Sequence, residues 1–254
     1  MMTKFLTLLP YWTVMLLVAS LIARKQKKLS RELLWAGVRT TVQLILLAFA
    51  LEVVFQSKLM IVSLLVALIM TFNSALQVVS RSNTRRYKIF WISFASHVFS
   101  LWPIAFLFSL DESPQNWLEP RMLLPLMGMI LGNSLSGVSI ALGAFIQTFK
   151  EKRGEILGLL ALGATAEEST RAVFFRSLKA GITPQINSMI AMGIVSIPGM
   201  MAGQLISQTS AIDAATVQIK MMLSISSGTI LCIYIALKFI RKKLFLPTGE
   251  LCLE

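Results

Sequence analysis

Few side chains in this 254-residue sequence could carry out chemistry. His97 is the only histidine, and 12 acidic residues face 24 basic ones. The sequence holds no HExxH zinc motif, no GxSxG nucleophile turn and no Walker A loop. A metal site usually needs several ligands. His97 is therefore better explained as an interior residue whose ring nitrogens are hydrogen-bonded within the protein. We therefore expect no enzyme, no cofactor bound by this chain, and metal ligands that remain unknown.

One block stands out because of its backbone chemistry: Ser196, Pro198, Gly199, Met200 and Met201 lie within an apolar stretch. Pro followed by Gly should break or kink a helix there. Freed backbone groups at membrane depth survive only inside protein or beside water, and broken spans often mark transport sites. The block predicts part of a transport path. A simple packing kink is the alternative.

Other polar or small residues lie inside apolar stretches, where they are costly unless they face a helix bundle or a water-filled path. We assign them to a translocation path or a dimer interface: Arg39, Gln43, Asn73, Gly128, Gly132, Asn133 and Gln218. Two alternatives stay open. Arg39 could extend its charge to the headgroups, and the Gly128/Gly132 pair could serve helix packing alone. The fourteen methionines are spread over most of the chain, as expected of core residues, although thioethers also bind soft metals.

The segment 146–185 is polar enough to lie outside the membrane, and it contains a predicted turn between two short helices. The residues that we expect to couple it to a partner are Leu162, Gly163, Ala164, Thr165, Glu167, Glu168 and Arg171. Thr165 can cap the second helix, with Glu168 completing a capping box. A basic amphipathic run, residues 171–179, follows, and we expect Gly181 and Pro184 to end it. The alternative is an amphipathic helix lying on anionic lipid.

Composition places the whole chain in a membrane. It is 56% hydrophobic and 14% charged, whereas soluble domains carry about 25% charged residues. Seven stretches are long and apolar enough to cross about 30 Å of hydrocarbon. They cover residues 5–23, 33–55, 59–79, 89–110, 122–145, 186–206 and 217–240. We expect an all-α, polytopic fold with about seven transmembrane helices, forming one domain over residues 1–254.

The net charge of +12 comes from basic clusters that flank the apolar stretches, which is the positive-inside pattern. It places the N-terminus outside, and the segment 146–185 and the C-terminus in the cytosol. The charge therefore indicates a lipid membrane as partner and argues against nucleic acid.

Four motifs together resemble the FetB/YbbM-type permeases of ABC transporters. They are RTTVQL at 39–44, PLMGMILGN at 125–133, LGAT at 162–165 and SIPGMMxG at 196–203. That family is linked to iron export, and its plant relatives to aluminium tolerance. The resemblance covers residues from about 30 to 245. The stretch 162–165 also resembles the cytosolic coupling loop of ABC importers, although Leu157 stands where that motif has Glu. Ala211 stands where the FetB/YbbM-type family has proline.

The resemblance implies a permease subunit in a bacterial inner membrane that exports iron or another metal or metal complex. It implies a homodimer of permeases and a separate cytosolic ABC ATPase that binds ATP and Mg²⁺. Two alternatives remain: an ATP-independent transporter or channel, and a membrane scaffold that recruits a cytosolic protein.

Overall fold

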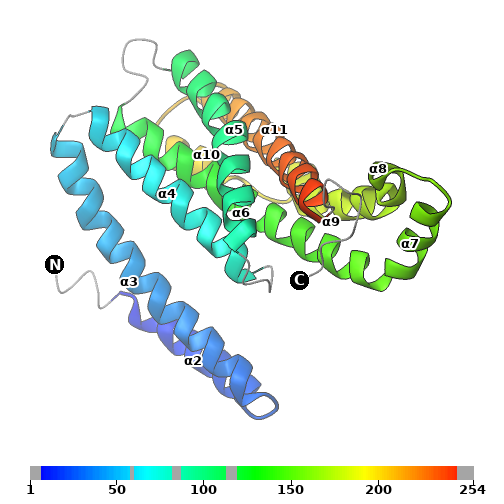
Figure 1. Cartoon of the computed structure of the whole chain (residues 1–254). Helices are drawn as coiled ribbons and strands as arrows, with labels where there is room; N and C mark the ends of the chain where they lie inside the picture. The colour runs from blue at the N-terminus through cyan, green and yellow to red at the C-terminus, as the bar shows by residue number, and fades with distance from the viewer. Residues whose placement is uncertain (1–6, 58–59, 82–86, 113–118, 245–254) are drawn as a thin grey trace. The chain divides into compact units, whose positions relative to one another are not determined.

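A computed structural model describes residues 7–57, 60–81, 87–112 and 119–244. Helices account for all the regular secondary structure of this part, so the predicted all-α class is confirmed. The helices, labelled in Figure 1, are α2 (Leu9–Ala23), α3 (Lys27–Ser57), α4 (Met60–Arg81), α5 (Tyr87–Glu112), α6 (Pro120–Glu151), α7 (Arg153–Ala161), α8 (Ala166–Ser169), α9 (Arg171–Ala191), α10 (Gly199–Ile206) and α11 (Ala211–Leu244).

Five of the described helices are long and apolar enough to cross a membrane: α3, α4, α5, α6 and α11. The shorter apolar α2 has 15 residues and would reach about 22 Å. The chain is therefore a multi-pass membrane protein. The predicted sixth span, residues 186–206, is not one helix, because it is divided between the end of α9, a non-helical segment and α10. The number of spans and their orientation stay predictions.

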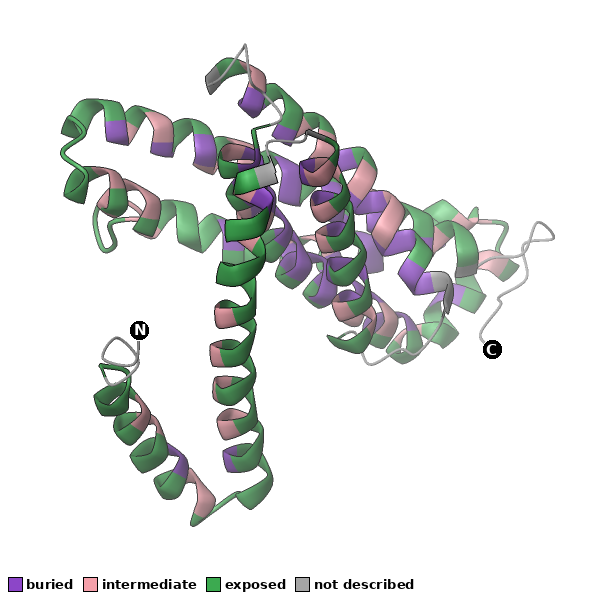
Figure 2. Ribbon diagram, turned by 90° about the vertical axis from the view of Figure 1, so that its left-hand side faces the viewer, coloured by how far each residue is buried: buried purple, intermediate pink, exposed green. Residues whose placement is uncertain are grey.

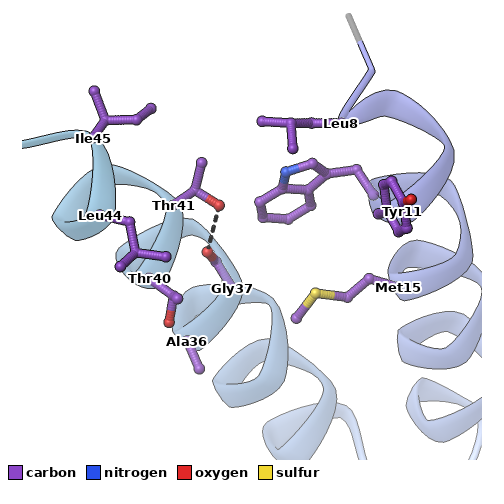
Figure 3. A pocket seen from close by; sticks show the side chains of 10 residues that line it. Leu8, Tyr11, Met15, Ala36, Gly37, Thr40, Thr41, Leu44 and Ile45 are labelled. Atoms are coloured by element: carbon purple, nitrogen blue, oxygen red, sulfur yellow. Dashed lines mark hydrogen bonds between the residues drawn. The ribbon is translucent and has the colours of Figure 1, made fainter. Parts of the chain in front are cut away.

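The contacts divide the chain into two units, Met1–Lys58 and Leu59–Glu254. That residues 1–254 form a single permease domain also stays a prediction. In the first unit, α2 packs against α3, and buried Ser30 donates a 2.7 Å hydrogen bond to the carbonyl of Ala19. A cavity of about 630 Å³ lies between these two helices. Thr40 and Thr41 are among the residues that line it (Figure 3). Thr41 donates back to the carbonyl of Gly37 at 3.0 Å, which leaves the cavity almost wholly apolar.

In the second unit, α6 packs against α4, α5, α9 and α11, and its buried residues face these neighbours (Figure 2). α6 and α9 approach each other closely at Gly137 and Gly181. A Cβ added at Gly181 would lie 2.8 Å from the Gly137 carbonyl oxygen and 2.7 Å from Ala141 Cβ. The two backbones can pack this closely only because Gly181 has no side chain.

The prediction that Gly181 and Pro184 end the basic run is wrong. α9 continues through both residues to Ala191, with Pro184 inside it. Gly181 is buried against α6, so packing outweighs its poor helix propensity. Pro184 removes one backbone donor but is exposed. The helix ends instead before Met192.

His97 is fully buried and joins α4 to α5. One ring nitrogen lies 3.1 Å from Ser74 Oγ, and the other lies 2.6 Å from the carbonyl oxygen of Ser93. Both ring nitrogens are therefore occupied by protein partners. The expectation of a satisfied interior histidine is confirmed.

Candidate functional site

The turn between α7 and α8, residues 162–165, has a well-defined backbone. Gly163 donates to the carbonyl of Leu160 and Ala164 to that of Leu159, both at 3.0 Å. This pair of bonds is a Schellman motif, which requires a left-handed residue after the C-cap. Gly163 supplies it, with φ of 90°. Glycine adopts this conformation without the steric cost that a Cβ brings.

The predicted capping box at the start of α8 is confirmed. Glu168 donates its backbone N–H to Thr165 Oγ1 at 3.2 Å. In return, the Glu168 carboxylate accepts the backbone N–H of Thr165 at 2.8 Å and the hydroxyl of Thr165 at 2.7 Å. These two bonds, the backbone bond first, lower the pKa of Glu168 because they favour its charged form. The turn is therefore held from both sides, by the Schellman motif and by the box.

Apolar side chains on α7 and its turn point away from the protein. Leu162 is 86% exposed and Leu157 is 44% exposed, whereas Ile156 of the same helix is buried. Charged residues surround this segment, among them Lys152 and Glu155, which form an ion pair at 2.7 Å. A rigid turn thus presents leucines in an otherwise polar region. Figure 1 places α7 and α8 beyond the ends of α6 and α9.

Arg241 of α11 anchors this region, a role that the sequence analysis missed. Its guanidinium donates to Glu167 at 2.5 Å and lies 4.9 Å from the centre of the Phe174 ring. Glu167 is 74 residues away in sequence, so no local spacing signals the pair. Of the other predicted coupling residues, Arg171 is exposed at the first position of α9. The structure thus brings the predicted coupling residues together and adds Arg241.

At the other end of α9, the predicted helix break is present at residues 192–198. Its backbone folds into a tight turn in which Gly193, with φ of 81°, donates to the carbonyl of Ser196 at 2.9 Å. Pro198 is the N-cap of the short helix α10, which begins at Gly199. Buried Gln218 of α11 contacts this turn through its amide nitrogen, which lies 3.9 Å from Met192 Sδ.

A cavity of about 640 Å³ lies beside the broken span, within the second unit. Met200 is the predicted site residue that lines it, together with Gln204 on the same face of α10. The remaining lining residues come from the end of α5, the start of α6 and α11: Phe108, Glu119, Arg121, Met122, Pro125, Leu126, Met129, Val217 and Met221. The cavity and the α7–α8 turn therefore lie at opposite ends of α6.

The Gly128/Gly132 pair divides between two environments. A Cβ at Gly128 would lie 3.3 Å from Met70 Cε of α4, whereas Gly132 has no neighbour within 4 Å. Asn133 is exposed and donates its amide to the carbonyl of Met129 at 2.8 Å. Helix packing within the chain therefore explains Gly128 but leaves Gly132 and Asn133 on an exposed face of α6.

Three further predicted residues do not line this cavity. Arg39 and Gln43 lie in the first unit, where they are exposed one turn apart on α3. Asn73 is exposed on α4 and donates to the carbonyl of Ile69 at 3.0 Å. Within the described residues, no group of three or more His, Cys, Asp or Glu side chains could hold a metal ion. A site for a hard cation built from such residues is thus lacking in the part of the chain that the structure describes.

These features define a multi-pass helical membrane protein with a hydrogen-bonded turn that exposes leucines. Comparison with known proteins names the family. The chain belongs to the group described as Uncharacterised protein family (UPF0014), whose model matches residues 5–245. This result confirms the family that the sequence motifs resemble.

The relatives are membrane proteins and permeases, and no enzymatic family is indicated. UPF0014 membrane protein slr1647 of Synechocystis sp. is 34% identical over 198 residues, which cover 76% of this chain and 75% of that protein. Probable iron export permease protein FetB of Escherichia coli is 29% identical over 227 residues, covering 87% and 86% of the two chains. UPF0014 membrane protein STAR2 of Oryza sativa is 28% identical over 196 residues, covering 76% and 67%. No solved structure matches this chain.

Proposed function

We propose that this chain is the transmembrane permease subunit of an ABC-type transporter in the bacterial inner membrane. It exports iron or another metal or metal complex, and a separate cytosolic ATPase that binds ATP and Mg²⁺ drives it. The printed name of the Escherichia coli relative, an iron export permease, supports the transport class and the choice of a metal.

The α7–α8 turn is the observation that carries this proposal. Leu162 is 86% exposed on a backbone held by two interlocking caps. Burial of this exposed apolar side chain by a partner would be favourable. A groove on an ATPase would bury Leu162 and Leu157 without having to order the turn first.

A continuous path of helix connects that turn to the broken span. α9 starts next to α8 and runs for 21 residues, about 31 Å, to the turn at residues 192–198. Arg241 fastens the first turn of α9 to α11, which carries Gln218 beside the break. A movement imposed on α8 would therefore reach the break through two helices, which is how ATP binding would change access to the cavity.

The exposed face of α6 supports a homodimer of permeases. Gly132, Asn133 and Ser136 are exposed on it, and a Cβ added at Gly132 would have no neighbour within 4 Å. Small residues spaced four apart let two membrane helices approach closely, and Asn133 adds an amide that can bond across them. This face would form the seam between two copies.

Co-purification with a co-expressed ABC ATPase tests the coupling site. Leu162→Glu changes only an exposed side chain, whereas reversing the charge of Glu167 or Glu168 would also break the Arg241 pair or the capping box. We expect Leu162→Glu to abolish the complex while the permease stays inserted. The matched control, Leu162→Met, keeps an apolar side chain and should bind as the wild type does.

Unchanged binding of Leu162→Glu would contradict docking at this turn. If the wild type binds no ATPase and still transports metal in vesicles without ATP, the chain is an ATP-independent transporter or channel. If it binds a different cytosolic protein and transports nothing, it is a scaffold.

A further inference from the structure

The cavity beside α10 has an unusual lining. Four of its eleven lining residues are methionine, whereas the whole chain has 14 methionines in 254 residues. These methionines come from three helices: Met122 and Met129 from α6, Met200 from α10 and Met221 from α11. An apolar cavity needs no sulfur, since leucine fills the same volume with more defined rotamers. The concentration of thioethers therefore indicates a ligand for which sulfur matters.

Gln204 gives a second, independent sign of a ligand. Its Oε1 atom is buried and has no hydrogen-bond partner among the described residues. A buried acceptor without a partner is destabilising, so it is retained where something else satisfies it. Gln204 lies one turn after Met200 on the same wall of the cavity. A residue with an unpaired oxygen acceptor thus lines the same cavity as the four methionines.

The chemistry of this wall selects among cations. Thioether sulfur is a soft ligand that prefers Cu(I) and similar ions, whereas hard cations need several oxygen ligands. Glu119 is the only carboxylate in the lining, and the guanidinium of Arg121 lies in the same wall. The cost of removing an ion from water rises with the square of its charge, so a monovalent ion enters an apolar cavity far more easily than a trivalent one. For a bare ferric or aluminium ion, this lining offers few oxygen ligands that could replace the hydration shell.

We propose that this cavity binds a soft monovalent cation, Cu(I) or Ag(I), through the thioethers of Met129, Met200 and Met221 with support from Gln204. The flexible methionine side chains reach the ion from three directions and can exchange places around it, which allows both binding and release. This proposal names a substrate class for the transport function above and rests on that function only for the fate of the bound ion. Binding itself needs no ATPase.

The test measures Ag(I) binding to the purified full chain in lipid nanodiscs. Both cysteines are first replaced, Cys232→Ala and Cys252→Ser, because thiols bind silver tightly. Bound silver is counted by mass spectrometry after desalting, and its affinity is obtained by competition with a chelator. We expect one tight site per chain.

The decisive variant combines Met129→Leu, Met200→Leu and Met221→Leu, which keep the cavity apolar and nearly unchanged in volume. Outer-shell changes alone cost metal sites 10–100-fold in affinity, so losing three direct ligands should weaken Ag(I) binding by more than about 100-fold. Gln204→Leu should weaken it less, by about tenfold. The matched control changes three methionines outside the cavity, Met15→Leu, Met70→Leu and Met189→Leu, and should bind silver as the background does.

Absence of the tight site, or its survival in the triple cavity variant, would overturn the proposal. Each variant is also tested for co-purification with the ATPase. Loss of silver binding with the ATPase complex intact supports the cavity as the ion site. If the wild type binds no ATPase but the silver result holds, the site stands and the ABC assignment fails.

Discussion

Glu168 shows how one side chain can hold a docking surface in shape. Its carboxylate accepts two hydrogen bonds from Thr165, which lower its pKa below the usual value near 4.3. Because the folded pKa is the lower one, the stabilisation is complete above the unfolded pKa and is lost as the pH falls through the folded pKa. The capping box is therefore intact at neutral pH.

We predict that the turn loosens only in acid, below about pH 4. Hydrogen exchange of the amides at residues 163–169, corrected for the intrinsic rate, should lose protection as the pH falls below about 4. Glu168→Gln can still form the box but cannot ionise, so its protection should not change over this range. If the wild type and the variant gave the same pH profile, Glu168 would not be the titrating group.

Gly163 controls the same turn through its backbone. Gly163→Ala would place a Cβ in the left-handed region and should destabilise the turn by about 1–2 kcal/mol. Gly158→Ala is the matched control on α7, where nothing lies within 4 Å and alanine should stabilise the helix by about 0.5–1 kcal/mol. Amide exchange at residues 160–168 measures both changes. A stabilising effect of Gly163→Ala would contradict the Schellman motif.

At the scale of helices, the close approach of α6 and α9 decides whether α9 can act as one rigid element. Gly181→Ala brings its Cβ to 2.8 Å from the Gly137 carbonyl oxygen, a backbone atom that cannot move aside cheaply. We expect it to destabilise the protein by about 1–3 kcal/mol, as overpacking in a core does. Denaturation in mild detergent, followed by circular dichroism, measures the change.

Gly143→Ala on α6 is the control for that experiment, because no atom lies within 4 Å of the added Cβ. It should be neutral or stabilise by up to about 1 kcal/mol. Equal stability of the two variants would show that α6 and α9 do not pack through Gly137 and Gly181.

For the molecule as a whole, the positive-inside pattern and the helix break predict which side each end of α9 faces. In a background without native cysteines, Leu162→Cys should react with an impermeant maleimide only in inverted vesicles. Ser207→Cys, just after α10, should react only in spheroplasts. Both positions are exposed, so access alone decides the labelling.

A variant that retains only buried Cys232 is the control and should stay unlabelled from either side. Labelling of both engineered positions from the same side would refute the predicted orientation.

Local interactions explain what the sequence by itself determined. The capping box joins residues three apart, and the helix break at residues 192–198 adjoins the Pro198-Gly199 pair. Apolar stretches long enough to span lipid are also local, so the membrane class followed from composition. Each of these features depends on a short stretch of chain, and no distant contact can easily reverse it.

Tertiary structure alone decided the features that depend on residues far apart in sequence. Arg241 meets Glu167 only when α11 packs beside α9. Gly181 continues a helix because α6 fills the space that a side chain would need. The cavity is lined by Met129, Met200 and Met221 from three helices, and packing alone brings these residues to one cavity.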